Sequence, residues 1–158
     1  MCHLRNKNMV IFIGEYPSKV DDRGRLVFPS QLRGALPADG DQRFVIKKDL
    51  FQPCLQMFTF EEWESQSSQV RSRINFFDKE QSEFWREYMR NRDIVEPDRK
   101  LGRILISRKL LDSIGVKKDV VFSGNDFMIE IWARENFEKS GISNEKYITI
   151  AEKLPENR

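Results

Sequence analysis

The sequence predicts an α+β fold, mainly β, that is built from a duplicated unit. A Gly-Arg pair followed by apolar residues occurs at Gly24-Arg25 and again 78 residues later at Gly102-Arg103. Around both copies, short β-branched or aromatic segments alternate with short helical patterns. Each unit of roughly 45 residues is too small to bury a core alone. The two halves are therefore expected to pack against each other.

In the first half, Gly24 provides the backbone freedom for a turn that precedes an apolar strand. Pro29 suits the first position of a helix, and Leu32 and Leu36 would form the buried side of that helix. The predicted elements are a strand over residues 10–13, a turn over 19–24, a strand over 26–28, a short helix that begins at 29 and is ended by Pro37 and Gly40, and strands over 44–46 and 55–57.

A long helical segment follows the first group of strands. Thr59 and Glu62 fit a capping box, and residues 61–92 are rich in Glu, Gln, Arg and Ser with scattered apolar positions. A break near 75–78 predicts two helices. The apolar positions from Val70 to Met89 could form a subunit interface or pack on the β structure, and the sequence favours neither.

The second half repeats the plan of the first. Ser107 suits the N-cap of a helix and Gly115 its end, and Trp63 and Phe137 occupy matching places in the last helix of each half. The predicted elements are an extended segment over 93–96, a turn at 102–103, a strand over 104–106, a helix from 107 to 115, strands over 120–122 and 128–132 separated by a turn over 123–126, and a helix over 134–139.

Overall charge says little about the partner. The chain has 27 basic and 25 acidic residues, a net charge of +2, which is far from the basicity of histone-like proteins. Residues 98–118 are locally basic, but a solvated helix face would look the same.

Cysteine usage and hydropathy indicate the compartment. Cys2 and Cys54 do not make a disulfide framework, so a reducing environment is expected. Cys2 and His3 could supply only two metal ligands, and no further His is present, so no metal site is predicted. No apolar run predicts a membrane span or a signal peptide. We therefore expect a cytoplasmic protein. Residues 1–8 are either a tail or the result of translation that starts upstream of Met9.

The sequence offers no set of residues for catalysis or for a cofactor. No Gly-rich phosphate loop or nucleophile elbow is present, and neither Cys has a base nearby in the sequence. Asp21-Asp22 lacks a third carboxylate for a metal-dependent nuclease. Trp63 and Trp132 could stack on bases, but their apolar surroundings favour a place in the core. We therefore expect no enzyme, no small-molecule substrate and no cofactor.

The chemistry of the duplicated motif rests on its arginines. The planar guanidinium fork matches phosphate oxygens or the O6 and N7 acceptors of guanine. Asp21, four residues before Arg25 across a tight turn, can hold that fork in position. The alternative is purely structural: Asp21 and Arg25 staple the turn, and Gly24 and Gly102 serve its backbone geometry.

These residues resemble the MraZ family of bacterial transcriptional regulators, which contain two SpoVT-AbrB type repeats. The resemblance runs from Ile13 to about Phe137 and rests on the opening Phe12 to Tyr16, both Gly-Arg turns with their strands, and the closing Ile129 to Trp132. It implies repeats over 15–63 and 92–137, a helical connector over 64–91, a tail over 1–8 and a partly helical tail over 138–158. It further implies a duplicated, AbrB-like swapped-hairpin β-barrel with pseudo-two-fold symmetry and short helices outside.

The function that the resemblance implies is sequence-specific binding to double-stranded DNA. The protein would bind short direct repeats in its own promoter, upstream of the division and cell-wall gene cluster, as a ring-shaped homo-oligomer in the cytoplasm at the nucleoid. A ring would present many weak basic turns to consecutive repeats, so a modest charge per subunit would suffice. An AbrB-like antitoxin or protein-interaction module is the alternative, although residues 140–158 are short and partly apolar for a disordered partner-binding tail.

Site residues follow from the same resemblance. Arg25 and Arg103 would contact bases, while the neighbouring basic residues would contact phosphates without specifying sequence; these are Arg23, Arg99 and Lys100. The family pattern has an Asp four residues before each Arg. Asp21 satisfies it, but in the second copy Arg99 stands at that place and Asp98 lies one residue earlier, where a local shift could let it substitute. Without a secured acidic partner for Arg103, Arg25→Ala is expected to cost more binding than Arg103→Ala.

Overall fold

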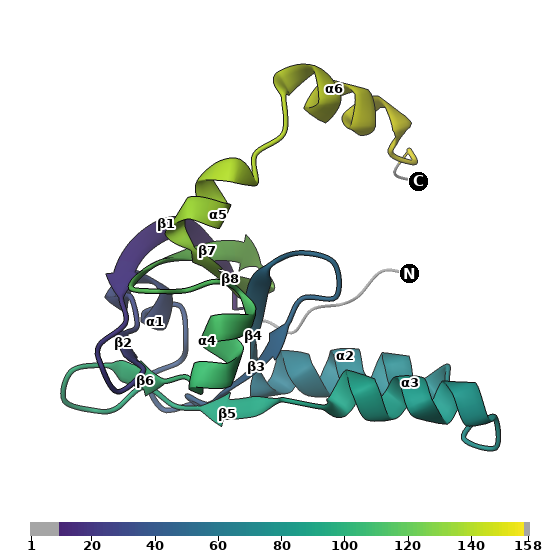
Figure 1. Ribbon diagram of the computed structural model, residues 1–158, viewed down its shortest axis with the longest axis horizontal. Helices are drawn as coiled ribbons and strands as arrows, with labels where there is room; N and C mark the ends of the chain where they lie inside the picture. Colours follow the sequence, from purple (N-terminus) through teal and green to yellow (C-terminus); the bar gives the residue numbers. More distant parts are fainter. Residues whose placement is uncertain (1–9, 157–158) are drawn as a thin grey trace.

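The computed structural model describes residues 10–156 and has a mixed α+β fold with mostly antiparallel strands (Figure 1). The strands are β1 (Phe12–Lys19), β2 (Arg25–Val27), β3 (Phe44–Lys48), β4 (Cys54–Thr59), β5 (Asp93–Val95), β6 (Arg103–Leu105), β7 (Asp119–Asp126) and β8 (Met128–Ala133). The helices are α1 (Ser30–Arg33), α2 (Phe60–Ser72), α3 (Lys79–Met89), α4 (Arg108–Ser113), α5 (Arg134–Lys139) and α6 (Asn144–Lys153).

The two halves of the chain share one six-stranded sheet. Its order is β1-β7-β8-β4-β3-β5, and β2 and β6 form a separate two-stranded ribbon. Strand β1 of the first half pairs with β7 of the second, and β5 of the second half pairs with β3 of the first. The order is therefore unchanged when the halves are exchanged. Over residues 10–156 no closed barrel is found, so the barrel implied by the family resemblance is not confirmed.

Aromatic rings from both halves meet in the main core. Phe28, which follows β2, lies 5.3 Å from Phe44 and 5.7 Å from Phe122 between ring centroids. Leu32 and Leu36, which were predicted to form the buried side of the first short helix, are buried in this cluster, as are Leu110 and Leu111 of α4. Because this core draws on both halves, neither repeat has a complete core of its own.

Helices α2 and α3 form a hairpin that projects from the sheet (Figure 1). The predicted break between them and the cap at Thr59, whose hydroxyl accepts from the N–H of Glu62 at 3.1 Å, are both confirmed. At the base of the hairpin Trp63 is buried and stacks on Tyr88 at 5.8 Å. Further out, Phe77 and Phe84 are exposed. These two apolar positions do not pack on the β structure.

Strand β1 is longer than the predicted strand and continues through Pro17 to Lys19. Proline has no N–H to donate, but β1 is an edge strand of the sheet, where a missing donor is tolerated. Helix α1 is also shorter than predicted. Pro29 is its N-cap and not its first residue, and the helix ends at Arg33.

The predicted turn over 123–126 is wrong, because these residues belong to β7. Gly124 pairs with Gly14 of β1, and a Cβ on Gly124 would lie 2.5 Å from the backbone N of Ile13. Glycine is needed there for close approach of two strands and not for a reversal. The chain reverses at the end of β7, between the paired residues Asn125 and Met128, where Asp126 has a φ of 62°.

The C-terminal segment holds two helices. Helix α5 matches the predicted range and brings Phe137 against Trp132, 6.0 Å away. Helix α6 stands apart from the sheet in Figure 1 and has no buried residue. None of the helices in the described part of the chain is long and apolar enough to span a membrane. The predictions for residues 1–8, Cys2 and His3 lie outside the described residues.

Candidate nucleic-acid interface

The first Gly-Arg turn is organised around the carboxylate of Asp21. One oxygen accepts from the N–H groups of Arg23 and Arg25, each at 2.9 Å, and the other accepts from Nε of Arg25 at 2.9 Å. Gly24, with a φ of 80°, closes the turn by donating to the carbonyl of Asp21 at 3.0 Å. The side chain of Arg25 is therefore held at Nε by Asp21.

The second turn has the same construction with one additional residue. Asp98 accepts from Nε of Arg103 at 3.1 Å and from the backbone N–H of Arg103 at 3.0 Å. Its other oxygen accepts from the N–H groups of Lys100 and Leu101 at 3.0 and 2.7 Å. Asp98 therefore substitutes as the acidic partner of Arg103, the alternative that the sequence left open. The longer loop moves Asp98, five residues before Arg103, into the place that Asp21 takes four residues before Arg25.

Both carboxylates are held in their ionised form. Hydrogen bonds from backbone N–H groups, above all that of Arg25, lower the pKa of Asp21 below its ordinary value of 3.8. For Asp98 the N–H of Leu101 is the largest cause, and together with the bonds from Arg103 it holds the pKa far below the usual range. Each arginine thus keeps a charged partner at physiological pH.

The β2–β6 ribbon brings the two turns together. Arg25 pairs with Leu105, Leu26 with Ile104, and Val27 with Arg103. Opposite residues of an antiparallel pair share a face, and residues two apart along a strand share it too. Arg25, Val27, Arg103 and Leu105 therefore lie on one face, and Leu26 and Ile104, each 1% exposed, lie on the buried face.

Backbone bonds extend the ribbon into both turns. The N–H of Ile106 donates to the carbonyl of Gly24 at 3.1 Å, and the N–H of Phe28 donates to the carbonyl of Gly102 at 2.8 Å. Each glycine predicted for turn geometry is thus also a point where the other half is anchored. The result is a single interface made from two sequence motifs.

The remaining predicted site residues lie at the tips of the turns. Arg23, Arg99 and Lys100 are all exposed there. One contributor was not predicted: Nη1 of Arg33, from α1, donates to the carbonyl of Asp98 at 3.4 Å and lies under Gly102. No motif in the sequence connects Arg33 with a loop 65 residues away.

Comparison with known proteins agrees with this geometry. The model of the MraZ family, described as "MraZ protein, putative antitoxin-like", matches residues 11–87 and 89–153. The chain belongs to the MraZ family. The two matched segments together contain both Gly-Arg turns and every strand of the sheet.

Relatives named "Transcriptional regulator MraZ" match nearly the whole of this chain. That of Bacteroides thetaiotaomicron is 32% identical over 152 residues, which span 95% of this chain and 97% of the relative. That of Christiangramia forsetii is 33% identical over 94% of this chain and 96% of its own length. That of Acetivibrio thermocellus is 36% identical over 91% of this chain and 96% of its own length.

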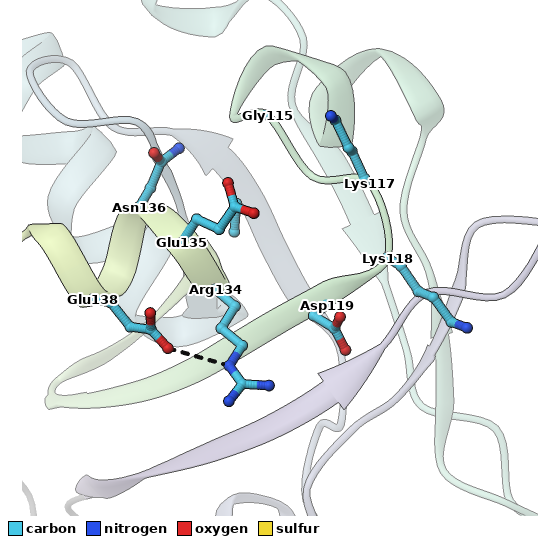
Figure 2. A pocket seen from close by; sticks show the side chains of 9 residues that line it. Gly115, Lys117, Lys118, Asp119, Arg134, Glu135, Asn136 and Glu138 are labelled. Atoms are coloured by element: carbon cyan, nitrogen blue, oxygen red, sulfur yellow. Dashed lines mark hydrogen bonds and ion pairs between the residues drawn. The ribbon is translucent and has the colours of Figure 1, made fainter.

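A surface pocket of about 540 Å³ lies away from the ribbon, between the start of β7 and α5 (Figure 2). Its charged side chains are of both signs, and Arg134 is paired with Glu138 at 3.3 Å. None of the predicted site residues lines it. Its wall supports the first turn only indirectly, because the carbonyl of Lys118 accepts from the N–H of Val20 at 2.8 Å.

One group of side chains has the composition of a metal site: Asp49, Cys54 and Glu130. The acidic members already accept hydrogen bonds from the protein, from Nε2 of Gln56 to Asp49 and from Nε1 of Trp132 to Glu130, each at 3.0 Å. Burial raises the pKa of the Cys54 thiol and so opposes the thiolate that a metal requires. The group is explained by hydrogen bonding within the sheet.

Proposed function

We propose that this chain is a sequence-specific DNA-binding transcriptional regulator. The observation that carries the proposal is the exposed face of the β2–β6 ribbon, where Arg25 and Arg103 lie together and each is held by a carboxylate. The names of its relatives, which cover nearly the whole chain, support the same function. The arginines act as base readers in this proposal, and no catalytic step is involved.

The shape of the ribbon suits the major groove of DNA. A groove about 12 Å wide admits a two-stranded β-ribbon. Asp21 and Asp98 bond Nε of their arginines, which leaves the Nη groups to donate to O6 and N7 of guanine. Because the carboxylates already restrict the arginine side chains, less conformational entropy is lost when DNA binds.

Contacts to the DNA backbone come from the turn tips. Arg23, Arg99 and Lys100 are exposed beside the ribbon, where they contact phosphates and position the chain without reading sequence. With a net charge of only +2, one subunit binds weakly. Several subunits in a homo-oligomer gain affinity through effective concentration when their sites on DNA are consecutive.

The full proposal is therefore an oligomer, forming a ring, that binds short direct repeats in its own promoter upstream of the division and cell-wall gene cluster. It places the protein in the cytoplasm at the nucleoid. It divides the chain into two AbrB-like repeats over 15–63 and 92–137 with a helical connector over 64–91, and the exchange of strands between the halves supports that division.

A second candidate function is that of an antitoxin-like or protein-interaction module. Exposed apolar side chains favour this function: Phe77 lies in the loop before α3, Phe84 on α3 and Tyr147 on α6. The family description also contains the term antitoxin-like. Such a partner would bind at the helices and leave the ribbon for DNA.

The test is DNA binding by the purified full chain. Duplexes are selected from a random pool and compared with the DNA upstream of its own gene by fluorescence anisotropy at physiological salt. The double variant Arg25→Ala, Arg103→Ala should lose at least about thirtyfold in affinity, since each bidentate base contact contributes about 1–3 kcal/mol.

Arg43→Ala is the matched control, because Arg43 also forms an exposed ion pair, with Asp41 at 2.8 Å, away from the ribbon. This variant removes one of the two positive charges that the double variant removes, and it should bind like wild type. Equal loss in both variants, or selection of no sequence with a steep dependence on salt, would show that only phosphates attract the chain.

A further inference from the structure

We propose that Val27 and Leu105 read the C5 methyl groups of thymines in the DNA between the two arginine contacts. This inference rests on the proposed function and assigns to the same ribbon a second, apolar kind of base recognition. It makes Val27 and Leu105 specificity-determining residues, whereas Arg25 and Arg103 supply the polar contacts.

The ribbon presents the two apolar side chains beside the arginines. Val27 is opposite Arg103 and Leu105 is opposite Arg25, and their side chains are 54% and 61% exposed. The core does not use them, because Leu26 and Ile104 fill the buried face of the same strands. The two residues occupy equivalent positions in the two halves of the chain. Single exposed apolar residues are common on protein surfaces. Here, however, an exposed apolar residue stands two positions after the arginine in both copies of the motif.

The thymine methyl is the apolar group that the major groove offers at base edges, and apolar side chains contact it in protein–DNA complexes. Val27 is well suited to such a contact because its χ1 is restricted and its carbonyl accepts from the hydroxyl of Ser18 at 3.0 Å. Diagonal neighbours in a β-ribbon lie about 7–8 Å apart. When both arginines reach base edges, the two apolar side chains therefore face the same short stretch of groove.

The positive charges of Arg25 and Arg103 beside the two apolar residues favour DNA over a protein as the partner of this face. An apolar protein surface seated on Val27 and Leu105 would also cover Arg25 and Arg103, which are only about one-third exposed as they stand. Burying two guanidinium groups without new acceptors costs free energy. The major groove provides methyl groups and acceptors together.

The experiment compares thymine with uracil. A duplex selected by the protein from a random pool is synthesised with deoxyuridine at single thymine positions, which removes one methyl and keeps base pairing. Wild type should lose about fourfold in affinity per contacted methyl, as expected from about 0.8 kcal/mol for one buried carbon unit. Val27→Ala or Leu105→Ala should abolish the discrimination at one position each, and circular dichroism checks that both variants remain folded.

Ile94→Ala is the matched control, since Ile94 is an equally exposed (61%) β residue on β5, outside the ribbon. It should keep the full preference for thymine. If wild type binds the thymine and uracil duplexes equally, or if both alanine variants keep the preference, the proposal is wrong. In those cases loss of binding by the arginine variants would still uphold the proposed function, whereas failure to select any sequence would overturn both.

Discussion

Arg25 and Arg103, 78 residues apart in the chain, lie on the same exposed face of one ribbon because Arg25 pairs with Leu105, two residues from Arg103. Each is bound at Nε by a carboxylate of its own turn, at 2.9 and 3.1 Å. The exposed fractions of the two arginine side chains, 34% and 33%, are nearly equal. The two motifs are therefore equivalent in geometry although their loops differ in length.

This equivalence predicts similar losses from the two single arginine variants. The basis for expecting the second motif to be weaker is removed by the contacts of Asp98. Arg25→Ala and Arg103→Ala should each lower the affinity for selected DNA by about fivefold to 150-fold, as expected from about 1–3 kcal/mol per bidentate contact. Isothermal titration calorimetry of each variant measures the loss. A Kd for Arg103→Ala close to that of wild type would show that the second motif does not read bases.

The carboxylates should matter less than the arginines they hold. Asp21→Ala and Asp98→Ala leave the guanidinium in place and release its side chain, so each should cost about twofold to tenfold in affinity. Asp41→Ala, which releases Arg43, is the control and should have no effect on DNA binding. Tighter binding after Asp98→Ala would indicate that the carboxylate only repels phosphate.

Gly24 is expected to be the least replaceable glycine of the interface. Its φ is 80°, and a Cβ would lie 2.9 Å from the backbone carbonyl of Ile106. Gly24→Ala should therefore lower the free energy of unfolding by more than the roughly 1–2 kcal/mol of the left-handed conformation alone.

The stability loss of Gly24→Ala can be compared with that of alanine variants at two other glycines, each measured by urea denaturation. At Gly102, with a φ of 67°, the close atom is Nη1 of the flexible Arg33, so the loss should be smaller. Gly34, at the end of α1 with a φ of −64°, should tolerate alanine. A ranking that places Gly34→Ala lowest in stability would contradict this account.

The titration of Asp98 should show which hydrogen bonds hold the second turn. Its pKa in the folded chain lies below the ordinary 3.8, so its ionised form stabilises the fold above that pH. This contribution is lost as the pH falls through the folded pKa. In Arg103→Ala the pKa should rise only part of the way, because the N–H of Leu101, the largest cause, remains. Carbon-13 NMR of the carboxyl group measures both, and full return to the ordinary value would show that Arg103 dominates.

Helix α6 should be involved in assembly. It has ten residues and exposes Tyr147 and Ile150 at helical spacing, with exposed Leu154 at its C-cap, and isolated helices shorter than about 12 residues are marginal in water. We expect Tyr147→Ser with Ile150→Ser to lower the mass of the oligomer in light scattering after gel filtration. Glu152→Ala, on the same helix, should leave the mass unchanged. An unaltered mass in the double variant would exclude α6 from the subunit contact.

The duplication and most elements could be predicted from local patterns. Apolar runs predicted β3, β4 and β8, and capping residues predicted the starts of α2 and α4, because these features depend on neighbours in the chain. The wrong predictions concern residues whose conformation is determined by contacts with segments distant in the sequence. Gly124 looks like a turn residue, and only the approach of β1 makes it part of a strand.

The sequence by itself determined that two Gly-Arg turns exist and that Asp21 can hold Arg25, because four residues across a tight turn are a local matter. Only the tertiary structure decided that Asp98 does the same for Arg103 across five residues, that Arg33 supports that loop, and that Val27 and Leu105 share the arginine face. The physical reason is the β2–β6 pairing. Its register depends on burial of Leu26 and Ile104 in a core built from both halves, and no local pattern contains that information.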